Sequence, residues 1–191
     1  MKIHEVQPFV NSIYIAEDMG VDSSAVQSSI DTMFSDMSLW ETGHTFRMQS
    51  KVLQDSSKFK MLFDVIDPIA KQTIESWGVT KPIRLKDYWI NIDGSTSSGT
   101  SHCHANALLS GCFYLTMPKG SGAIVIERPD PQEYVFKADV LNQYSYQIYT
   151  IVPKENSMVF FPSFMKHRVT KSFFENQLDK RISIAFDYGY A

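Results

Sequence analysis

SHCHANALLSGCFYLTM, residues 101–117, places two histidines directly before an apolar strand. His102 and His104 stand two positions apart, where the polar loop of residues 94–101 enters this strand. Alternate side chains of an extended chain share one face, so both imidazoles are expected to point at the same spot. The same alternation extends to Asn106, Ser110 and Tyr114. An HxH pair is a weak indication of a metal site, because histidine is a common metal ligand but also has other roles.

A third histidine and an arginine downstream strengthen this indication. His167 opens a strand shortly after the apolar run at residues 158–162, and a sheet rolled into a barrel can bring it beside the HxH strand. Arg181 begins the strand RISIAFDYG, in which it shares one face with Ser183. Its planar guanidinium suits a carboxylate, and it would be costly among apolar residues without an anionic partner. The alternative is an arginine at the barrel rim that pairs with an Asp or Glu of the chain.

Composition favours a folded domain with an ordinary core. Of the 191 residues, 43% are hydrophobic and 20% are charged, which excludes disorder as the default. The net charge of −3 disfavours nucleic acid as a partner. No apolar stretch is long enough to span a bilayer, and the N-terminus lacks the apolar run of a signal peptide. We therefore expect a cytoplasmic protein without membrane contact, whose Cys103 and Cys112 are reduced thiols.

The order of elements predicts an α+β, mainly β chain. Asp22 can cap a helix whose apolar residues begin at Val26, and a stronger stripe runs from Phe59 to Trp77. Pro68 is expected to kink or split this second helix. Strands are expected from residue 81 onward, and those at 106–117 and 123–127 read as a hairpin. We expect a single domain over 1–191, mostly helical in residues 1–79, with a β core in residues 80–191.

These ordered motifs resemble the 2-oxoglutarate/iron(II)-dependent oxygenase superfamily, in particular its branch with an HxH…SGxYYL signature. The resemblance covers roughly residues 80–190 and rests on HCHANALLSGCFYL, FFPSFMKHRV, RISIAF and the WxN of Trp89 to Asn91. It implies a double-stranded β-helix, or jelly roll, with the N-terminal helices packed outside. It also implies a dioxygenase that couples oxidative decarboxylation of 2-oxoglutarate to hydroxylation of a substrate, with Fe(2+) as the metal.

The resemblance further implies roles for individual residues. His102 and His167 match metal ligands. Arg181 and Tyr114 match the groups that hold the far carboxylate of 2-oxoglutarate, with two further cosubstrate contacts at Ser183 and Asn91.

One position departs from the family pattern. The usual set is two histidines and a carboxylate, and His104 stands where the Asp is expected. We prefer a set of three neutral imidazoles, His102, His104 and His167, because Asn is a poor ligand for iron. The alternatives are an HxN pair that uses Asn106, or a carboxylate from Glu127.

Two other functions stay open on the sequence alone. A cupin-like metalloenzyme would use the histidines without 2-oxoglutarate, and Gly99 fits a cupin motif whose expected Glu is missing. A jelly-roll binding module would have lost the chemistry altogether. The sequence does not specify the substrate, a small molecule or a protein side chain, or the oligomeric state. Residues 128–147 read as a loop or lid.

Overall fold

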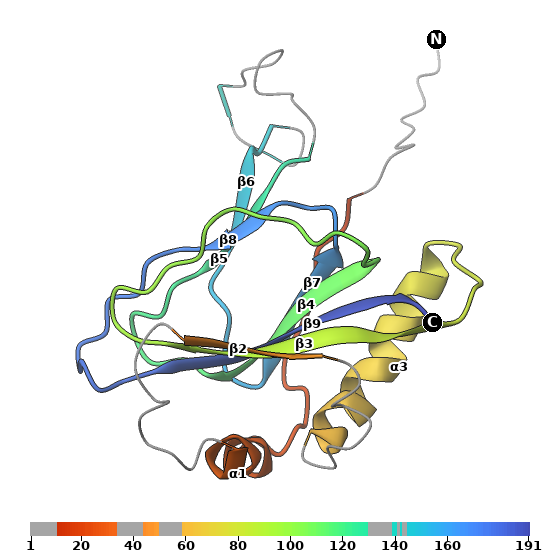
Figure 1. Ribbon diagram of the computed structural model, residues 1–191. Helices are drawn as coiled ribbons and strands as arrows, with labels where there is room; N and C mark the ends of the chain where they lie inside the picture. Colours follow the sequence, from red (N-terminus) through yellow and green to blue (C-terminus); the bar gives the residue numbers. More distant parts are fainter. Residues whose placement is uncertain (1–10, 34–43, 50–58, 130–138, 141, 143–144) are drawn as a thin grey trace.

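The computed structural model describes residues 11–33, 44–49, 59–129, 139–140, 142 and 145–191 (Figure 1). Its elements, in chain order, are β1 (Tyr14–Ala16), α1 (Ser23–Met33), β2 (His44–Gln49), α3 (Lys60–Ser76), β3 (Ile83–Asp93), β4 (Leu109–Thr116), β5 (Ile124–Glu127), β6 (Ile148–Ile151), β7 (Ser157–Pro162), β8 (His167–Val169) and β9 (Arg181–Tyr190). The predicted class is confirmed, with helices in the first part and most strands after them. The N-terminal part also supplies β1 and β2, which the sequence did not indicate.

The strands form two antiparallel sheets. The large sheet has six strands in the order β1-β7-β4-β9-β3-β2, and the small sheet has three in the order β6-β5-β8. Helices α1 and α3 lie on one side of the large sheet, and the small sheet lies on the other (Figure 1). This is the predicted jelly-roll arrangement with helices packed outside.

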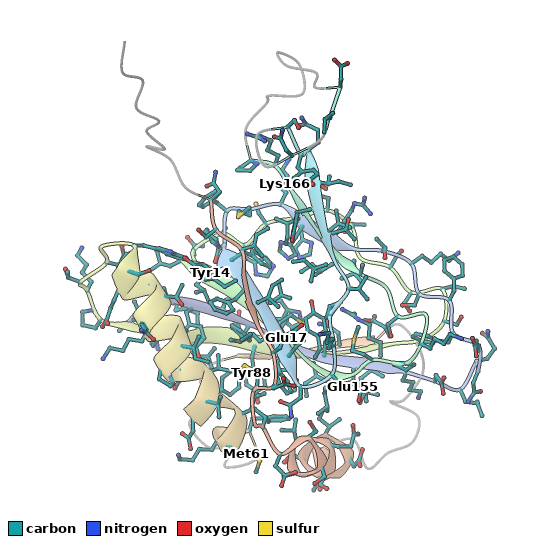
Figure 2. The ribbon with its side chains drawn as sticks, turned by 180° about the vertical axis from the view of Figure 1, so that it is seen from behind. Tyr14, Glu17, Met61, Tyr88, Glu155 and Lys166 are labelled. Atoms are coloured by element: carbon teal, nitrogen blue, oxygen red, sulfur yellow. The ribbon has the colours of Figure 1, made fainter. Side chains whose placement is uncertain are left out.

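Strand alternation divides the large sheet into two faces. The helix-facing core contains Tyr88 of β3, which is fully buried (Figure 2). The centroid of its ring lies 5.6 Å from that of Phe59 and 5.2 Å from that of Phe63. A smaller core forms between the sheets and includes Ile124, Val159 and Phe161, among others. The polar residues of β3, β4 and β9 alternate with the helix-facing core residues and therefore face the small sheet.

The two helices begin and end largely as predicted. Asp22 caps α1, since its Oδ1 accepts hydrogen bonds from the backbone N–H groups of Ser24 and Ala25, both at 3.1 Å. Helix α3 runs through Pro68 as one element, so the predicted split does not occur. Apolar residues on both sides of the proline, such as Ile66 and Ala70, are buried against the sheet and hold the helix together. No helix in the described ranges has the length and apolar character needed to cross a membrane.

The predicted hairpin between residues 106–117 and 123–127 is wrong. Strand β4 pairs with β7 and β9 in the large sheet, whereas β5 pairs with β6 and β8 in the small one. The connecting turn crosses between the sheets and passes very close to Thr170, the residue directly after β8. A Cβ on Gly122 would lie 2.0 Å from the carbonyl oxygen of Thr170, so only glycine fits there. The turn residues therefore connect β4 of the large sheet to β5 of the small sheet.

Candidate metal centre

The three histidines singled out from the sequence meet at one point between the sheets. One ring nitrogen of each histidine lies within 4.8 Å of the corresponding nitrogens of the other two. The ring centroid of His102 lies 5.1 Å from that of His104 and 4.4 Å from that of His167. The three residues are thus close enough together to hold one metal ion. His167 is buried, His104 is half-buried and His102 is exposed, so the group opens toward solvent on one side.

Backbone hydrogen bonds hold the HxH loop against β8. His102 and His167 form an antiparallel bridge, with N···O distances of 3.0 and 2.9 Å. The His104 N–H donates to the carbonyl of Ser163 at 2.9 Å. The two loop histidines are therefore not on β4, which starts only at Leu109. A turn separates them from the strand, and Asn106 within it has a φ of 65°.

Each histidine presents the same nitrogen to an acceptor. Nδ1 of His102 lies 2.8 Å from the Thr100 carbonyl, and Nδ1 of His167 lies 3.1 Å from the Met165 carbonyl. Nδ1 of His104 lies 2.6 Å from Oδ1 of Asp187. Carbonyl and carboxylate oxygens only accept hydrogen bonds, so each Nδ1 carries a proton. In the neutral imidazoles, the three Nε2 atoms are then the unprotonated ones, which is the form that binds a metal ion.

Burial keeps the innermost histidine neutral. The pKa of His167 is lowered to about 4, chiefly because burial disfavours its charged form and further because His102 and His104 lie close by. The hydrogen bond to the Met165 carbonyl opposes this shift. At neutral pH, His167 can therefore bind a cation without first losing a proton.

Asp187 is a residue that we did not single out from the sequence. It lies on β9 and is 6% exposed. Its Oδ1 accepts from His104 and, at 2.6 Å, from the hydroxyl of Ser110, which also bonds Ser163 at 2.8 Å. One sequence signal was available, because Asp187 has the same strand parity as Arg181 and Ser183. Its partner His104 could not be inferred from that parity.

A pocket of about 470 Å³ adjoins the histidines, within the usual size range for small-molecule sites. Its wall includes all seven residues predicted for the site, together with further residues of β3, β4, β9 and the 97–100 loop. The seven are His102, His104, His167, Arg181, Tyr114, Ser183 and Asn91. Trp89 also lines the pocket and lies 5.3 Å from the His104 ring. Asp187 does not line it and stands behind His104.

Arg181 is the charged group at the inner end of this pocket. It is 2% exposed and its guanidinium lies 5.4 Å from the Tyr114 ring centre. Nη1 pairs with Oδ2 of Asp93 at 2.6 Å, so the ion pair with a residue of the chain exists. The Nε of Arg181 and the Oγ of Ser183 are buried without a hydrogen-bond partner among the described residues. Burial raises the pKa of Tyr114 well above its usual value, so its hydroxyl keeps its proton.

The alternative ligands from the sequence lie elsewhere. Asn106 is exposed, and Glu127 has its Oε1 3.9 Å from Nε of Arg168. Neither lines the pocket. His44 begins β2, and His4 lies outside the described residues, as does much of the predicted lid at 128–147. Both cysteines are free thiols, as predicted.

Comparison with known proteins identifies one matching family and several solved structures with a similar fold. A family model described as "Putative 2OG-Fe(II) oxygenase" matches residues 87–187. No curated protein matches the sequence. Among solved structures, HygX from Streptomyces hygroscopicus with nickel and 2-oxoglutarate bound is 12% identical with a TM-score of 0.60, over 95% of this chain and 83% of HygX.

Two further structures share the fold. The viral collagen prolyl hydroxylase vCPH from Paramecium Bursaria Chlorella virus-1, a 2-oxoglutarate complex, is 11% identical with a TM-score of 0.61, over 94% of this chain and 96% of that one. The α-ketoglutarate-dependent epimerase SnoN from nogalamycin biosynthesis is 15% identical with a TM-score of 0.64, over 95% and 77%. At these identities the likeness concerns the architecture, which agrees with the predicted jelly roll.

Proposed function

Because the chain belongs to the 2OG-Fe(II) oxygenase family, whose model matches more than half of its length, we propose that it is an iron(II)- and 2-oxoglutarate-dependent oxygenase with His102, His104 and His167 as metal ligands. The family takes iron(II) and 2-oxoglutarate as its cofactors. When bound, they would supply the oxidising chemistry, in which O2 is the oxidant: one oxygen atom enters succinate as 2-oxoglutarate loses CO2, and the other oxidises a second substrate.

The orientation of the three imidazoles is the observation that carries this proposal. Each Nδ1 donates to an acceptor that is fixed by the fold, so each neutral ring keeps its lone pair on Nε2, and one ring nitrogen of each histidine lies within 4.8 Å of the others. Histidines that bind metals almost always donate their other ring N–H in this way. Three structural histidines would have no reason to share the same tautomer around one point. The donor set therefore suits a divalent transition metal.

The inner end of the pocket suits a dicarboxylate. The unpartnered Nε of Arg181 and Oγ of Ser183 are donors that a buried carboxylate could satisfy. The protonated hydroxyl of Tyr114 is a third donor. We assign these three residues to the far carboxylate of 2-oxoglutarate, with Asn91 as a further contact. The ion pair between Arg181 and Asp93 leaves the guanidinium with donors to spare, because an arginine has five N–H groups.

The outer part of the pocket is left for the substrate. Hydroxyl groups of Ser97, Ser98 and Thr100 line it, together with the indole of Trp89. These groups suit a neutral polar substrate portion that offers hydrogen-bonding groups and a flat or apolar face. A small molecule and a protein side chain both meet this description. We propose hydroxylation as the reaction class.

Calorimetric titration of 2-oxoglutarate into metal-loaded protein without oxygen tests the proposal, together with succinate release in the presence of oxygen. We expect one bound 2-oxoglutarate per chain, binding abolished in His167→Ala, and binding strongly weakened in Arg181→Gln. Metal binding without any 2-oxoglutarate binding would contradict the proposal and favour the cupin-like alternative. Failure to retain any divalent metal would favour a binding module.

A further inference from the structure

The buried carboxylate of Asp187 has no lysine or arginine beside it among the residues that the structure describes. Its hydrogen-bond partners are the His104 ring and the Ser110 hydroxyl, both 2.6 Å from its Oδ1. No Lys or Arg in the described part of the chain forms an ion pair with it. A carboxylate that is 6% exposed is costly to bury unless hydrogen bonds and an opposite charge compensate for the lost water. The two hydrogen bonds are present, and no lysine or arginine of the described ranges supplies the opposite charge.

A metal ion on the far side of the His104 ring would supply that charge. The carboxylate fixes Nδ1 of His104 as the protonated nitrogen, which leaves the lone pair on Nε2 of a ring whose centroid lies 5.1 Å from those of His102 and His167. The three proposed ligands are neutral, whereas the usual set of two histidines and one carboxylate brings a negative charge to the iron. Asp187 places a negative charge one imidazole away from the same point.

Resting on the proposed function, we propose that Asp187 is the positioning residue that compensates for the missing carboxylate ligand. It acts through His104, which it holds in the metal-binding tautomer and makes a stronger donor. In the usual site, a carboxylate ligand brings its negative charge directly to the metal. Here the negative charge of Asp187 lies behind the imidazole ring of His104.

The fold positions Asp187 for this role. It is the fourth residue of one face of β9, after Arg181, Ser183 and Ala185, and its cross-strand partner on β4 is Ser110. The Ser110 hydroxyl is also bonded to Ser163, whose carbonyl receives the backbone N–H of His104. The ring and the backbone of His104 are therefore tied to the same small network.

The proposal makes opposite predictions for the metal-free and metal-loaded protein. In Asp187→Asn the amide oxygen can still accept from His104 and from Ser110, but the buried charge is removed. Without metal, the variant should be as stable as the natural protein or more stable, because an uncompensated buried charge is gone. With metal, it should bind more weakly, because the ligand has lost its anionic partner. A purely structural carboxylate would lower the stability of both forms.

The experiment measures Co(II) affinity by chelator competition, the Co(II) absorption spectrum, and thermal unfolding with and without metal. We expect Asp187→Asn to lose about 10- to 100-fold in affinity. Its visible spectrum should shift, and its metal-free unfolding midpoint should not fall. Ser110→Ala is the matched control, because it removes the neighbouring hydroxyl but keeps the bond between Asp187 and His104. We expect it to change affinity by about threefold or less.

Two outcomes overturn the inference. One is an Asp187→Asn variant that binds Co(II) as tightly as Ser110→Ala does. The other is an Asp187→Asn variant that, without metal, unfolds at a temperature low enough to account for its weaker metal binding. That result would indicate a structural role for Asp187. Failure of the proposed function looks different, since the natural protein itself would then bind no metal or no 2-oxoglutarate.

Discussion

Replacing Asp93 by asparagine tests whether Arg181 is available to a cosubstrate. The two residues face each other across β3 and β9, and Nη1 lies 2.6 Å from Oδ2. The side chain of Arg181 is 2% exposed and that of Asp93 is 23% exposed. The amide keeps an oxygen that can accept the hydrogen bond, but the negative charge is lost. Arg181 is then a buried cation without an anion in the metal-free, ligand-free protein.

The size of the effect follows from this burial. Removal of one partner of a fully buried ion pair costs about 3–5 kcal/mol. The partial exposure of Asp93 and the remaining hydrogen bond reduce the expected loss to about 2 kcal/mol. For a chain of this length, that loss lowers the unfolding midpoint by about 4–8 °C.

The expected effect on 2-oxoglutarate has the opposite sign. The far carboxylate of the cosubstrate would no longer compete with Asp93 for the guanidinium, so the variant should bind 2-oxoglutarate about tenfold more tightly, which is about 1.4 kcal/mol. At a hundredfold excess over its dissociation constant, a ligand stabilises a protein by about 2.7 kcal/mol. 2-Oxoglutarate should therefore restore the midpoint that the substitution lowers.

The assay combines calorimetric titration of 2-oxoglutarate with thermal unfolding at a fixed ligand concentration, both on metal-loaded protein. Asp64→Asn is the control, because its ion pair with Lys60 is exposed, with 70% and 58% of the side chains accessible. It should change stability by less than about 1 kcal/mol and leave affinity unchanged. If Asp93→Asn binds 2-oxoglutarate no more tightly than the natural protein, Asp93 orients Arg181 rather than competing for it, and the reasoning fails.

Three further substitutions test the fold, each by thermal or denaturant unfolding. Pro68→Ala restores a helical N–H inside α3 and should stabilise the protein by about 1–3 kcal/mol; a loss would show that the proline is needed for packing. Gly111→Ala places a Cβ 2.4 Å from Cζ of Phe186 and should destabilise the core by about 1–3 kcal/mol, unless the ring can move at no cost. Asp67 accepts a hydrogen bond from Tyr188, and burial raises its pKa above the usual 3.8. Because the folded-state pKa is raised, stability falls as pH rises from the unfolded-state value of 3.8 through the raised pKa, so Asp67→Asn should flatten the decline in that interval; an unchanged pH profile would contradict this.

Strand alternation was sufficient to predict most of the pocket. Ser183 follows Arg181 by two positions on β9, and Tyr114 lies on the matching face of β4, so a period of two places these side chains between the sheets. The same rule failed at the hairpin. Adjacent strands pair through a tight turn in many sheets, but the pairings of β4 and β5 place them in different sheets, and the turn between them passes close to Thr170 at Gly122.

Strand alternation was also applied to residues that precede β4, where the chain is not a strand and the rule does not hold. Extended to Asn106, it predicted a ligand-facing side chain, but the left-handed backbone at that residue interrupts the strand and leaves the side chain exposed. His102 and His104 converge for another reason, since backbone pairing with His167 and Ser163 holds their loop in place. The sequence could indicate the three histidines as a set, but not the contacts that bring them together.

Asp187 shows why the chemistry of a site is harder to predict than its ligands. A search for a missing carboxylate near HxH in sequence finds Glu127 or nothing, because it assumes that the carboxylate binds the metal directly. The carboxylate that the structure offers lies 83 residues after His104 and contacts only the far nitrogen of its ring. A negative charge behind an imidazole acts on a bound ion through the ring, because it raises the basicity of the nitrogen that binds the metal. Strand parity places such a charge on the pocket side of β9 but does not link it to His104, and the link emerges from a buried carboxylate with no lysine or arginine beside it among the described residues.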